Sequence, residues 1–194
     1  MPCGLGGSKT TQRKLVLLGD GACGKTSLLN VFTRGYFPTV YEPTVFENYV
    51  HDIFVDGTHI ELSLWDTAGQ EEFDRLRSLS YDDTHAIMLC FSVDNQRFPR
   101  KRRVQMVALK CDLREQGADD EPAEGTEGAE PREKKPMIDY NQGLEVARRI
   151  NALRYLECSA MRNRGVNEAF TEAARVALSV NPNGGDGDGK CDVM

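Results

Sequence analysis

The chain of 194 residues lacks any apolar run near the roughly 18 residues of a membrane-spanning helix, so we expect no transmembrane segment. Residues 1–12 lack the apolar core of a secretory signal, and we expect no such leader. An excess of basic charge is also missing. With 24 Lys and Arg against 30 Asp and Glu, the net charge is −6, which argues against broad nucleic-acid binding.

The six cysteines include no C-x-x-C pair, and three of them, Cys90, Cys111 and Cys158, lie in or beside apolar runs typical of strands. This usage favours reduced thiols of a cytosolic protein over a disulfide framework. The length indicates one domain, and an apolar content of 40% is enough for a packed core.

A glycine-rich loop with the spacing G-x-x-x-x-G-K-[ST] follows the apolar residues 15–18 and precedes a helical pattern. Glycines let successive N–H groups turn toward an anion, and the following helix adds its positive end. Lys25 can reach the β- and γ-phosphates, and the Thr26 hydroxyl can ligate magnesium. The strand before and the helix after favour a P-loop over a chance turn. The residues expected at the phosphates are Gly19, Gly21, Ala22, Cys23, Gly24, Lys25, Thr26 and Ser27.

Hydrophobic periodicity predicts strands that alternate with helices along most of the chain, which indicates an α/β fold with a mostly parallel sheet. An Asp56-Gly57 turn predicts one antiparallel hairpin. The expected strands are residues 14–19, 46–55, 59–66, 86–91, 104–109 and 154–157. The expected helices are residues 24–34, 73–81, 141–151 and 166–180.

Two further stretches supply groups for the phosphate end of a nucleotide. Asp66 ends an expected strand, so it can hold magnesium through a water molecule, and the Gly69 N–H can meet a γ-phosphate. Gln70 can orient an attacking water. Thr44 ends a loop broken by two prolines, and its hydroxyl and N–H can close over magnesium and the γ-phosphate.

Two more stretches suit a guanine base. Lys110-Cys111-Asp112 follows a strand, and the Asp112 carboxylate can accept hydrogen bonds from the guanine N1–H and exocyclic amine, a donor pair that adenine lacks. The backbone of Ser159 and Ala160 can reach the guanine oxygen. An ATP-using P-loop kinase is disfavoured because it has no use for these motifs.

Together these motifs resemble the Rho family of small GTPases, most closely in residues 37–49 and 66–77, which read FPTVYEPTVFENY and DTAGQEEFDRLR. Fungal Rho proteins look nearest. The resemblance implies a P-loop GTPase fold, a six-stranded sheet with helices on both faces, and a GDP/GTP switch that needs Mg²⁺. It implies catalytic roles for Gln70, Lys25 and Thr44, and places Phe37 and Tyr41 beside the nucleotide.

The resemblance also implies partners: exchange factors, GTPase-activating proteins, a dissociation inhibitor and effectors that read residues 39–49 and 69–79. We expect slow hydrolysis without an activating partner, and a monomer without nucleic-acid partners. The residues expected to touch effectors are Val45, Phe46, Glu47 and Tyr49.

Two departures from the family pattern bear on whether the chain can fold and bind nucleotide as the family does. Leu109 stands where the family has a polar residue that ties the base loop to the P-loop, and losing this hydrogen bond costs about 0.5–1.5 kcal/mol. We expect weaker nucleotide binding without lost specificity.

Only residues 95–103 separate two expected parallel strands, too few for the family's packed third helix, which we expect to be missing or truncated. The five basic residues at 97–103 suit a phosphoinositide or partner patch, but the junction of an altered transcript or gene model is the favoured reading.

The domain is expected to span residues 13–180, after a flexible arm at 1–12. Residues 114–136 form an acidic Rho-type insert, for which a tolerated loop is favoured over an effector site. Residues 181–194 form a tail ending in Cys191-Asp192-Val193-Met194, a prenylation box of the farnesyl type. One lipid anchors weakly, so Cys3 is a candidate for S-acylation, with a plain exposed thiol as the alternative.

We therefore expect a prenylated Rho-type GTPase at the cytoplasmic face of the plasma membrane, with a cytosolic pool, that signals to actin, polarity or secretion. The alternative is a membrane-tethered binding protein, or a defective isoform, that holds nucleotide poorly because of Leu109 and the short 95–103 segment.

Overall fold

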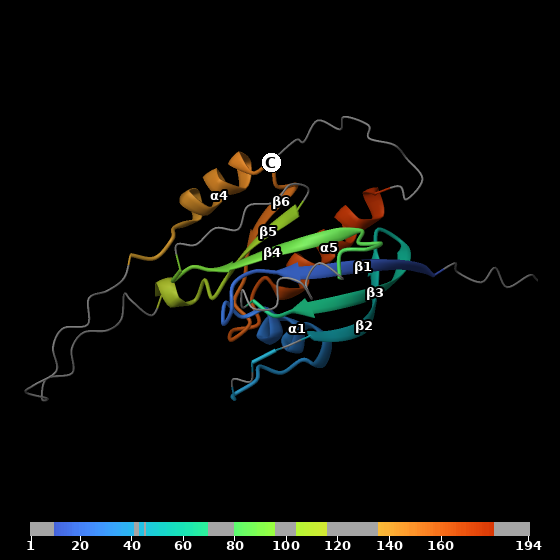
Figure 1. The fold of residues 1–194 in the computed structure, drawn as a ribbon, viewed down its shortest axis with the longest axis horizontal. Helices are drawn as coiled ribbons and strands as arrows, with labels where there is room; N and C mark the ends of the chain where they lie inside the picture. Colours follow the sequence, from blue (N-terminus) through green and yellow to red (C-terminus); the bar gives the residue numbers. More distant parts are fainter. Residues whose placement is uncertain are drawn as a thin grey trace, which may run out of the picture.

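A computed structural model describes residues 10–40, 43–44, 46–69, 80–95, 104–115 and 136–180. Six strands form one sheet in the order β2-β3-β1-β4-β5-β6, in which only β2 and β3 pair antiparallel (Figure 1). The expected six-stranded, mostly parallel α/β sheet is confirmed. Its elements are β1 Thr11–Leu18, α1 Lys25–Arg34, β2 Phe46–Val55, β3 Thr58–Thr67, β4 Ala86–Ser92, β5 Val104–Leu109, α4 Tyr140–Arg149, β6 Arg154–Glu157 and α5 Val166–Ser179.

Helices cover both faces of the sheet because successive strand residues point to opposite sides. On one face, α1 and α5 pack on a cluster that includes Leu15, Leu17 and Met88. On the other face, α4 packs on a second cluster that includes Val16, Leu89 and Met106. Figure 1 shows α4 and α1 on opposite sides of the strands.

Some expected element ends were wrong. Residues 80 and 81 are not helical, so the helix expected at 73–81 does not reach Tyr81, and its other residues up to 79 lie outside the described ranges. Helix α4 begins one residue early because Asp139 and Gln142 form a capping box at its start. Residues 113–115 form a helical turn where a loop was expected, and Arg114 holds it there by a bidentate ion pair with Glu157 of β6.

The connection from β4 to β5 is the short segment singled out by the sequence. The two strands pair in parallel from Ile87↔Val104 to Ser92↔Leu109, so residues 93–103 must return along about five residues of strand, roughly 17 Å. The Val93 amide donates to the carbonyl of Leu109 at 3.1 Å, which starts the return at the edge of the sheet. The third helix, expected to be missing or truncated, would fall in residues 96–103, which lie outside the described part.

The strand that follows this connection carries a polar residue in the core. Gln105 of β5 is fully buried, and its Nε2 donates to the carbonyl of Ala169 on α5 at 2.8 Å. Its Oε1 has no hydrogen-bond partner in the described part of the chain. An unpaired buried polar atom costs about 1–3 kcal/mol, although β5 itself is fully buried and pairs with a strand on each side.

Candidate functional site

The candidate site lies where parallel strands end, because β1, β3, β5 and β6 all present their carboxyl ends at one edge of the sheet. The loop after β1 has the backbone that its glycines predict. Gly19 and Gly24 have φ of 152° and 109°, and a Cβ on Gly19 would lie 2.1 Å from the carbonyl oxygen of Cys90. Only glycine fits there, so the loop can pass close to β4 before α1 begins.

The Lys25 ammonium is held over this loop. Its Nζ donates to the carbonyls of Gly19 and Asp20, each at 2.9 Å, and the side chain is buried. These contacts bend the lysine back along the loop and concentrate positive charge where phosphate would sit. The neighbouring Cys23 thiol is also buried, and burial raises its pKa.

The three residues expected to serve magnesium meet at one point. Thr26 Oγ1 donates to Asp66 Oδ2 at 2.5 Å and lies 2.6 Å from Thr44 Oγ1. Asp66 is fully buried, and this burial raises its pKa to about 6. Its Oδ1 has no partner in the described ranges. Hard oxygen donors around an unpaired buried carboxylate oxygen fit a magnesium ion that keeps several waters.

Gly69 sets the distance between the β3 loop and the P-loop. A Cβ at Gly69 would lie 2.1 Å from the backbone nitrogen of Gly21, so glycine alone allows this approach. The Gly69 backbone therefore stands beside the expected γ-phosphate position. Gln70, the residue expected to orient water, lies outside the described residues.

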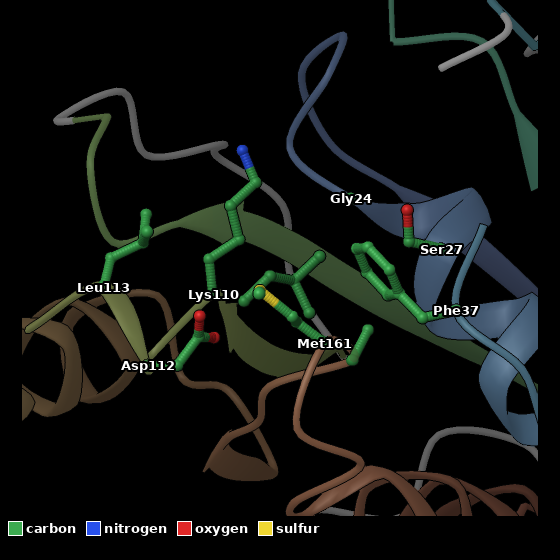
Figure 2. A pocket seen from close by; sticks show the side chains of 9 residues that line it. Gly24, Ser27, Phe37, Lys110, Asp112, Leu113 and Met161 are labelled. Carbon is green, nitrogen blue, oxygen red and sulfur yellow. The ribbon is translucent and has the colours of Figure 1, made fainter. Parts of the chain in front are cut away.

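The base end of the site is a hollow of about 480 Å³, counting its open mouth (Figure 2). Asp112 is almost fully buried at this hollow, where its carboxylate can meet a base. Leu109, only 3% exposed, forms part of the wall, and its Cδ1 lies 3.7 Å from the position of a Cβ on Gly24. The leucine thus touches the P-loop by packing alone. The lining residues are Gly24, Ser27, Phe37, Leu109, Lys110, Asp112, Leu113, Ala160 and Met161.

The loop after β6 reaches the same hollow. Ser159 is fully buried, and its amide pairs with the Arg164 carbonyl at 2.9 Å, which folds residues 159–164 into a tight turn. Ala160 lines the hollow from this turn. The Cys111 amide donates to the carbonyl of Cys158 at 3.3 Å and joins the two base loops.

Two lining residues were not predicted. Leu113 follows Asp112 in the short helical turn, and Met161, 61% exposed, follows Ala160. Figure 2 shows Met161 and Lys110 reaching into the hollow from different loops, with Phe37 on the P-loop side. Direct adjacency to each motif was the signal that could have found both residues.

The expected effector residues begin at the edge strand β2. Phe46 is exposed and lies edge-on to Trp65 with ring centroids 5.1 Å apart. The Tyr49 hydroxyl donates to Glu47, and burial together with this bond raises the pKa of Tyr49 to about 12.

Four other expected residues lie outside the described ranges: Cys3, Tyr41, Val45 and Cys191. Within those ranges, no helix is long and apolar enough to cross a membrane.

Comparison with known proteins identifies the site's family. The sequence profile of the Ras family matches residues 14–103 and 95–179, two matches that overlap at the short connection. GTP-binding protein rho3 of Schizosaccharomyces pombe is 60% identical over 192 residues, 91% of this chain and 88% of the relative. RHO3 of Saccharomyces cerevisiae is 54% identical over 206 residues, 90% and 88% of the two chains. The rho1 protein of Schizosaccharomyces pombe is 46% identical over 182 residues, 86% and 87% of the two chains. The chain therefore belongs to the Rho-type small GTPases of the Ras family.

Proposed function

We propose that this chain is a GTP-binding and GTP-hydrolysing switch that uses Mg²⁺ and is anchored to the cytoplasmic face of the plasma membrane, with a cytosolic pool. The observation that carries the proposal is the meeting of Thr26, Thr44 and Asp66 beside Lys25, next to a hollow that is lined by Asp112 and by Gly24 and Ser27 of the P-loop segment. These groups match a phosphate–magnesium end and a guanine end.

In this proposal each residue has a distinct task. Lys25 binds the β- and γ-phosphates, and Asp112 accepts hydrogen bonds from the guanine N1–H and amine. Magnesium, when bound, neutralises charge on the phosphates. Thr26 and Thr44 would ligate the ion, and Asp66 would hold it through a water molecule. Gln70 orients the attacking water, so the protein works by positioning and charge rather than by covalent chemistry.

Loss of the γ-phosphate removes the reason for Thr44 to lie over Thr26, which is how hydrolysis would release the loop that carries the effector residues. The partners we propose are exchange factors, activating proteins, a dissociation inhibitor and Rho-class effectors, with outputs in actin, polarity or secretion. We propose a monomer without nucleic-acid partners.

The first test is the guanine-nucleotide content and GDP release rate of the purified full chain with magnesium. A second version carries a family-length segment in place of residues 95–103. Tightly held nucleotide in both versions supports the switch as it stands. Binding in the restored version alone supports the alternative, a nucleotide-poor, membrane-tethered binding protein or defective isoform.

Hydrolysis is tested separately with Gln70→Leu. The substitution removes the group that orients water, so single-turnover GTP hydrolysis is expected to stall while GTP binding stays intact. Gln12→Leu, on the exposed start of β1, is the matched control. Equal hydrolysis rates for Gln70→Leu and the wild type would remove the role given to Gln70.

Membrane anchoring is tested with Cys191→Ser, which removes the prenylated thiol. We expect the protein to move from the membrane fraction to the soluble fraction, because one remaining acyl group on Cys3 anchors only marginally. A Cys3→Ser chain is the companion variant. Full membrane fractionation of Cys191→Ser would defeat the prenyl anchor.

A further inference from the structure

The two loops that form the base end of the site belong to different strands, and a single acidic residue outside the hollow joins them. Glu115 lies three residues after Asp112, at the end of the short helical turn. Its Oε1 lies 2.6 Å from Arg164 Nη1, and its Oε2 lies 2.8 Å from Arg162 Nη1. Each carboxylate oxygen therefore holds one guanidinium of the loop after β6.

The same loop is held to the Lys110-Cys111-Asp112 stretch at a second place. Arg164 Nη2 lies 3.4 Å from Cys111 Sγ, so this arginine contacts both Glu115 and the residue beside Asp112. Glu115, Arg162 and Arg164 are all exposed, and none of them lines the hollow. Their contribution to a bound base is therefore indirect.

Hydrogen bonds within the turn connect the two arginines to the residues that line the hollow. The Arg162 amide donates to Ser159 Oγ at 3.1 Å, and the Arg164 amide donates to the Ser159 carbonyl at 3.0 Å. Ala160 and Met161, which line the hollow, lie between these fixed points. Anchoring both arginines thus keeps the part of the turn that faces the base closed against the Lys110–Asp112 loop.

We propose that Glu115 is a positioning residue that slows guanine-nucleotide release by clamping residues 158–164 against residues 110–113 through Arg162 and Arg164. The inference rests on the proposed function and deepens it. Because the clamp is built from exposed charges, each pair contributes little by itself and responds to salt. Nucleotide release from this chain is therefore set partly by ionic strength at a point outside the binding hollow.

The test compares Glu115→Gln, which keeps the shape and removes the charge, with Glu145→Gln. Glu145 pairs with Arg149 at 2.9 Å on α4, also in an exposed ion pair, and does not line the hollow. Release of a fluorescent GDP is measured at about 50 mM and 1 M salt, where the screening lengths are roughly 14 Å and 3 Å. We expect Glu115→Gln to release GDP about 3- to 10-fold faster at low salt and at the wild-type rate at 1 M. The control stays at the wild-type rate in both.

A double-mutant cycle separates the clamp from a general loss of stability. Glu115→Gln combined with Arg164→Gln is expected to release GDP little faster than the faster single variant, because both changes break the same pair. Fully multiplicative effects, or an unchanged release rate for Glu115→Gln, would overturn the proposal. So would a difference that persists unaltered at 1 M salt.

A nucleotide-free measurement separates this inference from the proposed function. Amide hydrogen exchange of residues 159–164 in the nucleotide-free chain is expected to be faster in Glu115→Gln than in the wild type or in Glu145→Gln. Should the wild type hold no guanine nucleotide, the proposed function fails, while faster exchange still supports the clamp. Unchanged exchange at these amides overturns it.

Discussion

The phosphate end and the base end of the site differ in the kinds of side chain that form them. At the phosphate end, Lys25, Asp66 and the Thr26 hydroxyl are buried or partly buried polar groups that bond to one another or to the loop backbone. At the base end, one carboxylate, Asp112, lies among mostly apolar side chains, two of which, Phe37 and Met161, are exposed. The difference assigns affinity mainly to the phosphate end and selectivity mainly to the base end.

Features expected to cost binding or folding energy gather near the base end. Leu109 replaces a hydrogen bond by packing, and Gln105, four residues earlier on β5, leaves an amide oxygen unpaired in the core. The same strand follows the short connection from β4. If the short connection strains β5, we therefore expect the base loop to be displaced before the P-loop is.

The largest expected effect is that of Gly69→Ala on GTP binding at the phosphate end. The new Cβ would lie 2.1 Å from the nitrogen of Gly21, so the P-loop backbone must move. A clash of about 3 kcal/mol, at the upper end for overpacking, lowers GTP affinity at least about 100-fold. Gly57→Ala is the control for backbone strain without a clash, because Gly57, unlike Gly69, has a positive φ of 77° and nothing lies within 4 Å of its Cβ position.

Titration with a fluorescent GTP analogue measures the effect, with melting temperatures recorded for both variants. GTP affinity at the wild-type level in Gly69→Ala would mean that the P-loop does not need its present position. The assignment of affinity to the phosphate end would then fail.

The next effect concerns the base end. Among the residues that the structure describes, Asp112 is the only carboxylate lining the hollow. Asp112→Ala removes it, and each hydrogen bond to a charged group is worth about 1.5–3 kcal/mol. GDP affinity is expected to fall about 10- to 100-fold, and the preference for GDP over ADP by a similar factor. Competition of GDP and ADP for the labelled nucleotide measures both, with Asp52→Ala on exposed β2 as the control. An unchanged preference would move base selection to the backbone of Ser159 and Ala160.

The phosphate end could be predicted from the sequence because its geometry is local. Residues 19–27 are contiguous, and a Gly-rich loop between a strand and a helix has few alternative backbones. Thr44 and Asp66 were placed by their positions after a loop and at a strand end, and the structure brings both to Thr26.

The base end was less predictable because it is assembled from four separate segments. Asp112 and Ala160 are marked by short motifs, but Met161 and Leu113 line the hollow only because of how two neighbouring loops turn. The bridge from Glu115 to Arg162 and Arg164 joins residues 47 and 49 positions apart, and no local pattern signals such a pairing. The capping box of α4 was readable from Asp139 and Gln142 but was missed.

The smallest expected effect comes from Leu109, and it tests whether a polar side chain at this position would make the base end hold GDP longer. Leu109→Asn supplies a polar side chain that can bond to the P-loop, and one net hydrogen bond of about 0.5–1.5 kcal/mol slows GDP release about 2- to 12-fold. Leu109→Ala, which removes the packing on Gly24 without adding a polar group, is expected to hasten release. If Leu109→Asn hastens release as Leu109→Ala does, packing by the leucine is the contact that holds the base loop. The hydrophobic wall of the base end then performs the task that a hydrogen bond performs in the family pattern.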